Sequence, residues 1–196
     1  MKPTVSALLA PFACAALLLA PAFGPPAHAA DAAATPAAAE SIERGRYLVS
    51  VLGCHDCHTP WTLGPNGPEP DMTRMLSGHP QALEMPAPPT LPDGPWQVVA
   101  SATNTAWAGP WGVSFTANLT PDADTGLGRW SYENFRDTIR TGRRHGRGRA
   151  ILPPMPIPAY RQLVDADLAA VYAYLQSIPP IGNRVPEPLP PAGSED

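Results

Sequence analysis

The sequence predicts a mainly α-helical domain that carries a long proline-rich excursion between its helices. Three segments repeat their apolar residues with helical spacing, at 42–52, 132–141 and about 166–178. Proline is frequent, with 28 in 196 residues, and the stretch 59–117 has few periodic apolar runs. Because proline interrupts helices and central strands, we expect much of the remaining chain to be loop.

Length and charge narrow the class of protein. A chain of 196 residues is long enough for one domain with an apolar core of its own. The formal net charge of −4 excludes a globally basic nucleic-acid binder. We therefore expect no nucleic-acid partner, although a local basic patch remains compatible with this charge.

The first thirty residues are typical of an export signal. Lys2 gives a short basic start, an apolar stretch follows, and the small residues of AHAA resemble a cleavage site. We expect a signal peptide at 1–30, a linker at 31–41 and a mature protein in the periplasm. The apolar stretch is short and interrupted by prolines, so no membrane span is expected after cleavage. Cleavage leaves Cys54 and Cys57 as the only cysteines.

The first helix is expected from Ile42 to just before Gly53. Ile42, Val49 and Leu52 recur at helical intervals, and Ser41 is a suitable N-cap. Gly53 ends the pattern immediately before the cysteines.

Two later helices have clear boundaries. The segment 132–141 is preceded by Ser131 as an N-cap and followed by Gly142 as a stop. The segment 166–178 has an apolar stripe, acidic residues at its start and prolines directly after its end.

The excursion at 59–117 is expected to be ordered, with at most short strands. Its tryptophans would be costly to expose, so we expect it to pack on something large and apolar: Trp61, Trp96, Trp107 and Trp111.

The motif CHDCH at 54–58 admits three chemical interpretations. A zinc site would need further ligands, and only the distant His79 and His145 are available. A redox dithiol usually lies at the start of a helix in a strand-rich fold, whereas this motif follows a helix. The third interpretation is a covalently attached haem, with two thioether bonds and the adjacent histidine as the axial ligand of the iron.

Covalent haem is the interpretation that the sequence favours. It uses both remaining thiols, Cys54 and Cys57, and gives His58 a role as proximal ligand. It also explains how a chain with limited regular structure forms a core, since three to four helices would surround one haem c. His55, between the cysteines, is expected to face solvent.

The second axial position is assigned to Met155. This residue lies among four prolines in ILPPMPIP, just before the last helix. Because prolines restrict the backbone, less conformational entropy is lost when the methionine binds the iron. Filling core space is the alternative role for a methionine. Rival ligands lie elsewhere in the chain: Met72, Met75, Met85, His79 and His145.

Two filled axial positions favour electron transfer over substrate chemistry at the iron. We therefore expect an electron carrier or electron-transfer subunit rather than an enzyme. The alternative is a haem-based ligand sensor or haem enzyme with an open distal site. An optical spectrum with and without carbon monoxide separates the two.

At the level of whole segments the sequence resembles the class I cytochromes c. The segments GCHDCHTP, NLTPDADTGLGRWSYENFRDTIRTG and LVDADLAAVYAYLQSIPP are similar to exported bacterial monohaem cytochromes and to cytochrome subunits associated with dehydrogenases. The resemblance covers about 42–182, which is the expected cytochrome domain. A proline-rich tail follows at 183–196.

The resemblance implies the class I cytochrome c fold and a defined set of haem residues. Cys54 and Cys57 would be the thioether anchors, His58 the proximal ligand and Met155 the distal ligand. Redox partners such as a dehydrogenase or a terminal acceptor are expected, and the chain is a possible subunit of a larger complex.

The resemblance also implies that the first and last helices pack together. Gly45 and the region Tyr172–Tyr174 would lie near their crossing.

Two further segments stand out beside this pattern. The arginine-rich stretch 140–149 is either a solvated loop or a patch that attracts an acidic partner or the haem propionates. TPDADTG at 120–126 is expected to form a capped turn rather than a calcium site.

Overall fold

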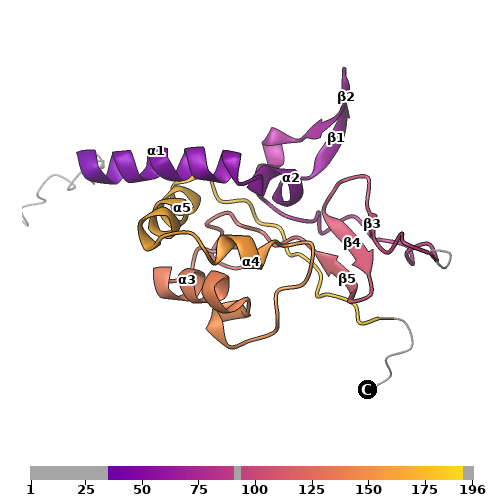
Figure 1. The fold of residues 1–196 in the computed structure, drawn as a ribbon. Coiled ribbons are helices and arrows are strands. Elements are labelled where there is room, and N and C mark those ends of the chain that lie inside the picture. The colour runs from indigo at the N-terminus through magenta and orange to yellow at the C-terminus, as the bar shows by residue number, and fades with distance from the viewer. Residues whose placement is uncertain (1–34, 91–93, 192–196) are drawn as a thin grey trace, which may run out of the picture. The chain divides into compact units, whose positions relative to one another are not determined.

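The computed structural model describes residues 35–90 and 94–191. The expected signal peptide at 1–30 lies outside these residues, as does the first part of the expected linker. Among the described residues, no helix is both long and apolar enough to cross a membrane. Five helices run through the described residues (Figure 1): α1 (Pro36–Val51), α2 (Cys54–His58), α3 (Tyr132–Thr141), α4 (Ile157–Tyr160) and α5 (Asp165–Ser177).

The expectation of a helical domain holds only in part, because two small sheets accompany the helices. Strands β1 (Trp61–Gly64) and β2 (Gly67–Pro70) form an antiparallel hairpin. A second antiparallel sheet has the order β3 (Val99–Ala100), β4 (Ala106–Gly109) and β5 (Gly112–Phe115). All five strands lie within the excursion and none exceeds four residues, as the sequence predicted for this segment.

Helix α1 begins earlier than predicted. It starts at Pro36, with Thr35 as the N-cap, rather than at Ile42 with Ser41. The Thr35 hydroxyl accepts a hydrogen bond from the Ala38 amide at 3.3 Å, and proline suits the first helical position. The added residues 36–41 include three alanines, which have high helix propensity but add nothing to the apolar stripe on which the prediction depended.

Helices α1 and α5 form the most extensive packing between any two elements described. Gly45 is buried at their crossing, where a side-chain Cβ would overlap the Ala170 carbonyl and lie 2.8 Å from the Tyr174 Cβ. Glycine therefore allows the two backbones to approach closely. This contact, which the family resemblance implied, is confirmed.

The core forms where this helix pair meets α3 and the segments between the sheets. Leu168, Leu175 and Val49 are almost completely buried there, together with Leu76 from the excursion. Helix α3 is capped by Ser131, whose hydroxyl accepts from the Asn134 amide, and ends at Gly142. Both ends agree with the prediction, and α5 begins at Asp165 and ends at Ser177, each within a residue of the predicted bounds.

The turn at 120–126 is a capped turn, as predicted. One carboxylate oxygen of Asp122 accepts hydrogen bonds from the Thr125 amide at 2.8 Å and from the Thr125 hydroxyl at 2.6 Å. These bonds lower the pKa of Asp122 below its usual value. The carboxylate therefore closes the turn on itself.

The described part of the tail, 183–191, packs along the domain. The Asn183 side chain is buried and donates hydrogen bonds to the carbonyls of Ser77 and His79, at 2.7 and 2.8 Å. Further along, Leu189 forms an antiparallel bridge with Val113 of β5. These contacts hold the tail against loops that are far away in the sequence.

Candidate haem site

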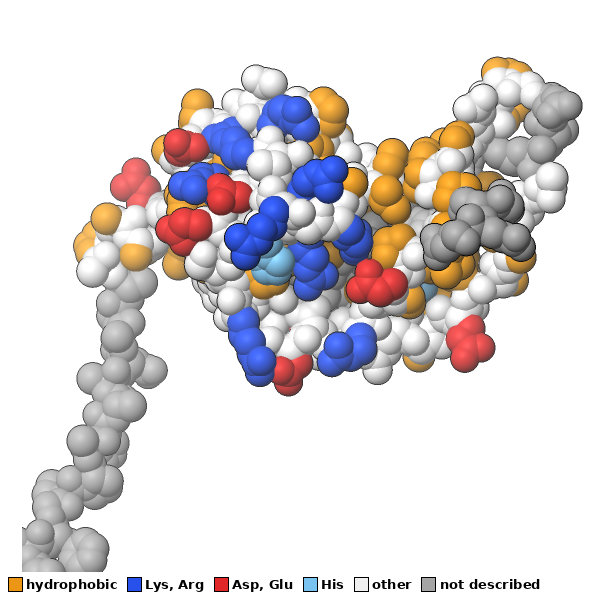
Figure 2. Space-filling model, turned by 90° about the horizontal axis from the view of Figure 1, so that it is seen from below, with side chains coloured by type: hydrophobic (Ala, Val, Ile, Leu, Met, Phe, Trp, Pro, Cys, Tyr) orange, Lys and Arg blue, Asp and Glu red, His pale blue; other side chains and the backbone are white. Residues whose placement is uncertain are grey.

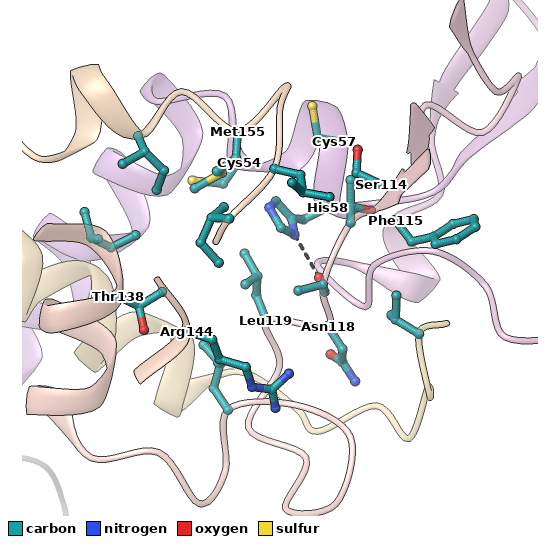
Figure 3. A pocket seen from close by; sticks show the side chains of 18 of the residues that line it. Cys54, Cys57, His58, Ser114, Phe115, Asn118, Leu119, Thr138, Arg144 and Met155 are labelled. Carbon is teal, nitrogen blue, oxygen red and sulfur yellow. Dashed lines mark hydrogen bonds between the residues drawn. The ribbon is translucent and has the colours of Figure 1, made fainter. Parts of the chain in front are cut away.

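The candidate site is a cavity of about 330 Å³ with mostly apolar walls. This volume lies in the range of cofactor sites in proteins. Segments from most of the domain line it, from α2 and β5 to the residues before α4 and the start of the tail. The four predicted site residues are all among its lining: Cys54, Cys57, His58 and Met155. Figure 3 shows their side chains along one margin, with Arg144 across the open centre.

A sharp turn brings the cysteines to this cavity. Gly53 has a φ of +69° and joins the end of α1 to the start of α2. A side chain here would be strained in this left-handed conformation and would lie 2.9 Å from a carboxylate oxygen of Asp56. Since residues three apart share one face of a helix, the short helix α2 presents Cys54 and Cys57 to the same side.

His58 is buried, with 8% of its surface exposed, and one ring nitrogen is held in place. Its Nδ1 lies 2.8 Å from the carbonyl oxygen of Ala117. A carbonyl only accepts, so Nδ1 carries the hydrogen and donates it, which leaves the Nε2 lone pair free (Figure 3). Burial is the main cause that lowers the pKa of His58, while the Ala117 bond opposes it. The imidazole is therefore neutral at pH 7, which is the form that binds metals.

The two cysteines are free thiols rather than a disulfide. Burial raises the pKa of Cys54 to about 12 and also raises the pKa of Cys57. Both are therefore protonated at neutral pH in the free protein, whereas dithiol exchange requires a thiolate. The extra histidines that zinc would need do not line the cavity. His79 is bonded through its ring nitrogens to Thr105 and Leu83, and the ring of His145 lies 4.1 Å from that of Trp130.

Met155 is half-buried and packs against the apolar core. Both flanks of its segment are anchored to other elements. Before it, the Pro153 carbonyl accepts a 2.6 Å hydrogen bond from the Ser114 hydroxyl of β5. After it, the Tyr160 hydroxyl donates to the Leu52 carbonyl at the end of α1. The prolines thus stiffen a segment whose two ends are also tied.

The rival methionines lie away from the cavity. Met72 and Met85 are 56% and 36% exposed, and neither lines it. Met75 packs on the core, where its sulfur lies 4.0 Å from the Tyr174 hydroxyl. Among the described residues, Met155 is the only methionine of the lining.

The lining fits a flat apolar group with acidic substituents, as a haem with two propionates is. Its walls are mostly apolar, and three arginines also line it: Arg144, Arg149 and Arg184. Thr116, also in the lining, is buried, and its hydroxyl is without a hydrogen-bond partner among the residues described. Buried hydroxyls are rarely left unpaired, so a polar atom of a bound group would satisfy it.

Several lining residues were not predicted from the sequence. Ser114, Thr116 and Ala117 come from the excursion, and Tyr160 comes from α4. Only the tertiary arrangement identifies them, because no local pattern marks a residue that reaches a cavity through contacts between distant segments.

The expectation that the excursion's tryptophans pack on something large and apolar was wrong in part. Trp96 is 78% exposed, and none of the four lines the cavity.

A cysteine pair, a neutral buried histidine and a methionine around one apolar cavity define the chemistry of a c-type cytochrome. Comparison with known proteins agrees. The chain is 29% identical over 175 residues to the alcohol dehydrogenase (quinone), cytochrome c subunit, of Gluconobacter oxydans. It is 28% identical over 154 residues to the gluconate 2-dehydrogenase cytochrome c subunit of Pantoea cypripedii. It is also 30% identical over 148 residues to a subunit of the nicotinate dehydrogenase of Pseudomonas putida.

This chain is thus a homologue of cytochrome c subunits of bacterial dehydrogenases, as the resemblance predicted. The matches cover 87%, 76% and 76% of the chain, respectively, but only 27%, 27% and 9% of those relatives. The chain therefore spans about a quarter or less of the length of the relatives that it matches. No family model matches it.

Proposed function

We propose that this chain is a periplasmic monohaem cytochrome c that carries single electrons between a dehydrogenase and a downstream acceptor. The observation that carries the proposal is the convergence of Cys54, Cys57, His58 and Met155 on one apolar cavity. These residues come from two segments almost a hundred positions apart in the sequence.

Each residue has a defined role in this proposal. Cys54 and Cys57 would anchor the haem through thioether bonds, and His58 would bind the iron through Nε2. The Ala117 carbonyl fixes the tautomer and orientation of that imidazole, as partners behind metal-binding histidines commonly do. Met155 would fill the opposite position. Further polar groups of the lining would face the propionates: Arg144, Arg184 and the Thr116 hydroxyl.

The haem would supply a one-electron couple at its iron. The chain would contribute by keeping other ligands and water away from the iron. Since Met155 is tied on both sides, it can compete with outside ligands although a thioether binds weakly. Substrate oxidation would then belong to the dehydrogenase, and this chain would pass on the electrons.

The test combines the exported, purified protein with the variant Met155→Ala. The wild-type reduced form should keep its spectrum under carbon monoxide. The variant should retain covalent haem, bind carbon monoxide and have a lower reduction potential, by a fraction of the ~0.8 V range that axial ligands control.

Met72→Ala is the matched control, because Met72 is exposed and outside the cavity. It should leave both the spectrum and the potential unchanged. Rapid carbon monoxide binding by the wild-type protein would contradict the proposal and favour an open-site sensor or haem enzyme. A Met155→Ala spectrum identical to wild type would assign the distal position to another residue.

A further inference from the structure

Positive charge is concentrated in one short segment of this acidic protein. Residues 140–149 contain five of the thirteen Lys and Arg residues and no Asp or Glu, although the formal net charge of the chain is −4. Figure 2 shows Lys and Arg side chains gathered on one face of the molecule, with fewer acidic side chains between them. The segment joins α3 to the residues that precede Met155.

Only part of this charge is neutralised within the protein. Arg140 pairs with Asp165 at 2.6 Å, and Arg149 pairs with Glu187 at 3.3 Å. The remaining three are exposed and form no ion pair with any described residue: Arg143, Arg144 and Arg147. We call these three the arginine surface. The nearby carboxylate of Asp137 is itself paired with Arg136 at 2.8 Å.

The backbone under the arginine surface is well fixed. The Arg144 amide donates to the Arg149 carbonyl at 3.0 Å, and Arg143 forms an antiparallel bridge with Ala150. The His145 amide donates to the Thr138 hydroxyl of α3 at 2.9 Å. A fixed backbone reduces the entropy that is lost when a partner binds.

The arginine surface also adjoins the haem cavity. Arg144 lines the cavity, and its guanidinium lies 5.5 Å from the centre of the Trp130 ring, which lines it too. Arg143 and Arg147 do not belong to the lining. Their charge is therefore available to a partner even when Arg144 faces a propionate.

We infer that the arginine surface docks an acidic protein surface, so that a redox partner exchanges electrons at the adjoining edge of the cavity. This inference rests on the proposed electron-carrier function. Guanidinium groups bind carboxylates in a planar, two-pronged geometry, and complementary charges accelerate encounter. A protein partner is favoured over a membrane because the charge lies beside the cavity, where electrons would cross to another protein.

The first test measures how charge steers small redox reagents to the reduced holoprotein. At low ionic strength the anionic oxidant ferricyanide should react about 10-fold more slowly with Arg143→Glu/Arg147→Glu than with wild type. The cationic oxidant tris(phenanthroline)cobalt(III) should react faster with the variant. Both differences should shrink when salt is raised to screen the charges.

Arg46→Glu is the control, because Arg46 is exposed on α1 and away from the cavity. It should change either rate by less than about 2-fold, because Arg46 belongs neither to the cavity lining nor to the arginine surface. The single variant Arg147→Glu should fall between wild type and the double variant. Equal effects of Arg46→Glu and Arg147→Glu on ferricyanide oxidation would overturn the inference, since only net charge would then matter.

The second test measures binding of the holoprotein to polyglutamate and to phosphatidylglycerol vesicles. Polyglutamate should bind wild type and Arg46→Glu alike, and should bind the double variant at least about 5-fold more weakly. Binding to the vesicles without binding to polyglutamate would overturn the inference that the partner is an acidic protein. A protein that exchanges electrons with neither oxidant refutes the proposed function itself. Normal electron exchange without a charge effect refutes only the docking surface.

Discussion

At the scale of the residue, the site depends on groups that orient others. The Ala117 carbonyl selects the tautomer of His58, and the tied flanks restrict the segment that carries Met155. All of these supporting bonds end on backbone carbonyls. The sequence around a backbone carbonyl does not indicate which side chain will donate a hydrogen bond to it. These partners therefore could not be predicted.

Tyr160 is the most direct test of this support. Its hydroxyl joins the segment after Met155 to Leu52, which lies directly before the cysteine turn. Tyr160→Phe removes that bond and leaves the ring, at a cost of about 1 kcal/mol. We expect normal haem attachment, but roughly fivefold tighter binding of carbon monoxide or imidazole to the haem, as measured by optical titration.

Tyr132→Phe is the matched control for that experiment. The Tyr132 hydroxyl also donates to a backbone carbonyl, that of Asp165 at 3.2 Å, but Tyr132 does not line the cavity. It should lose similar stability without any change in ligand binding. If both variants bind ligand alike, Tyr160 has only a structural role.

At the scale of the element, the α1–α5 pair supports the site. Helix α1 leads directly into Gly53 and the cysteine helix α2, so its position against α5 fixes where the cysteines lie. The apolar periodicity of both helices was visible in the sequence. The start of α1 was not, because its first turn is built by a cap and alanines rather than by an apolar stripe.

Gly45→Ala tests this helix pair. The added methyl group would overlap the Ala170 carbonyl of α5, and the tightly packed backbones have little room to separate. We expect a loss of about 1–3 kcal/mol in the free energy of unfolding, despite the better helix propensity of alanine. Denaturant unfolding of the holoprotein measures it.

Ser50→Ala provides the reference on the same helix. Ser50 is exposed, so its substitution should change the unfolding free energy by less than about 0.5 kcal/mol. A Gly45→Ala variant as stable as Ser50→Ala would show that the two helices do not approach as closely as described.

At the scale of the whole molecule, sequence and fold contributed different parts of the site. The motif at 54–58 and the proline-flanked Met155 were predicted from their spacing and composition, and the fold places all four side chains on one cavity. The wall contributed by β5 and by the described tail was not predictable. Strand and tail meet only through tertiary contacts such as the bridge between Val113 and Leu189.

The exposed Trp96 illustrates the limit of arguments from residue type alone. A large aromatic side chain favours burial on average, but its place in a fold depends on which neighbours reach it. The relatives, which are cytochrome c subunits of dehydrogenases, agree with the resemblance found in the sequence. In the docking inference, the arginine surface would bind such a partner beside the cavity.

The most direct measurement is the intact mass of the exported, mature protein under denaturing conditions, alongside the variant Cys54→Ala/Cys57→Ala. Two thioether bonds predict the mass of the chain plus one haem for the wild type and the bare chain for the variant. A wild-type mass without haem, or one explained by zinc or an internal disulfide, would contradict the haem anchor on which the electron-carrier proposal depends.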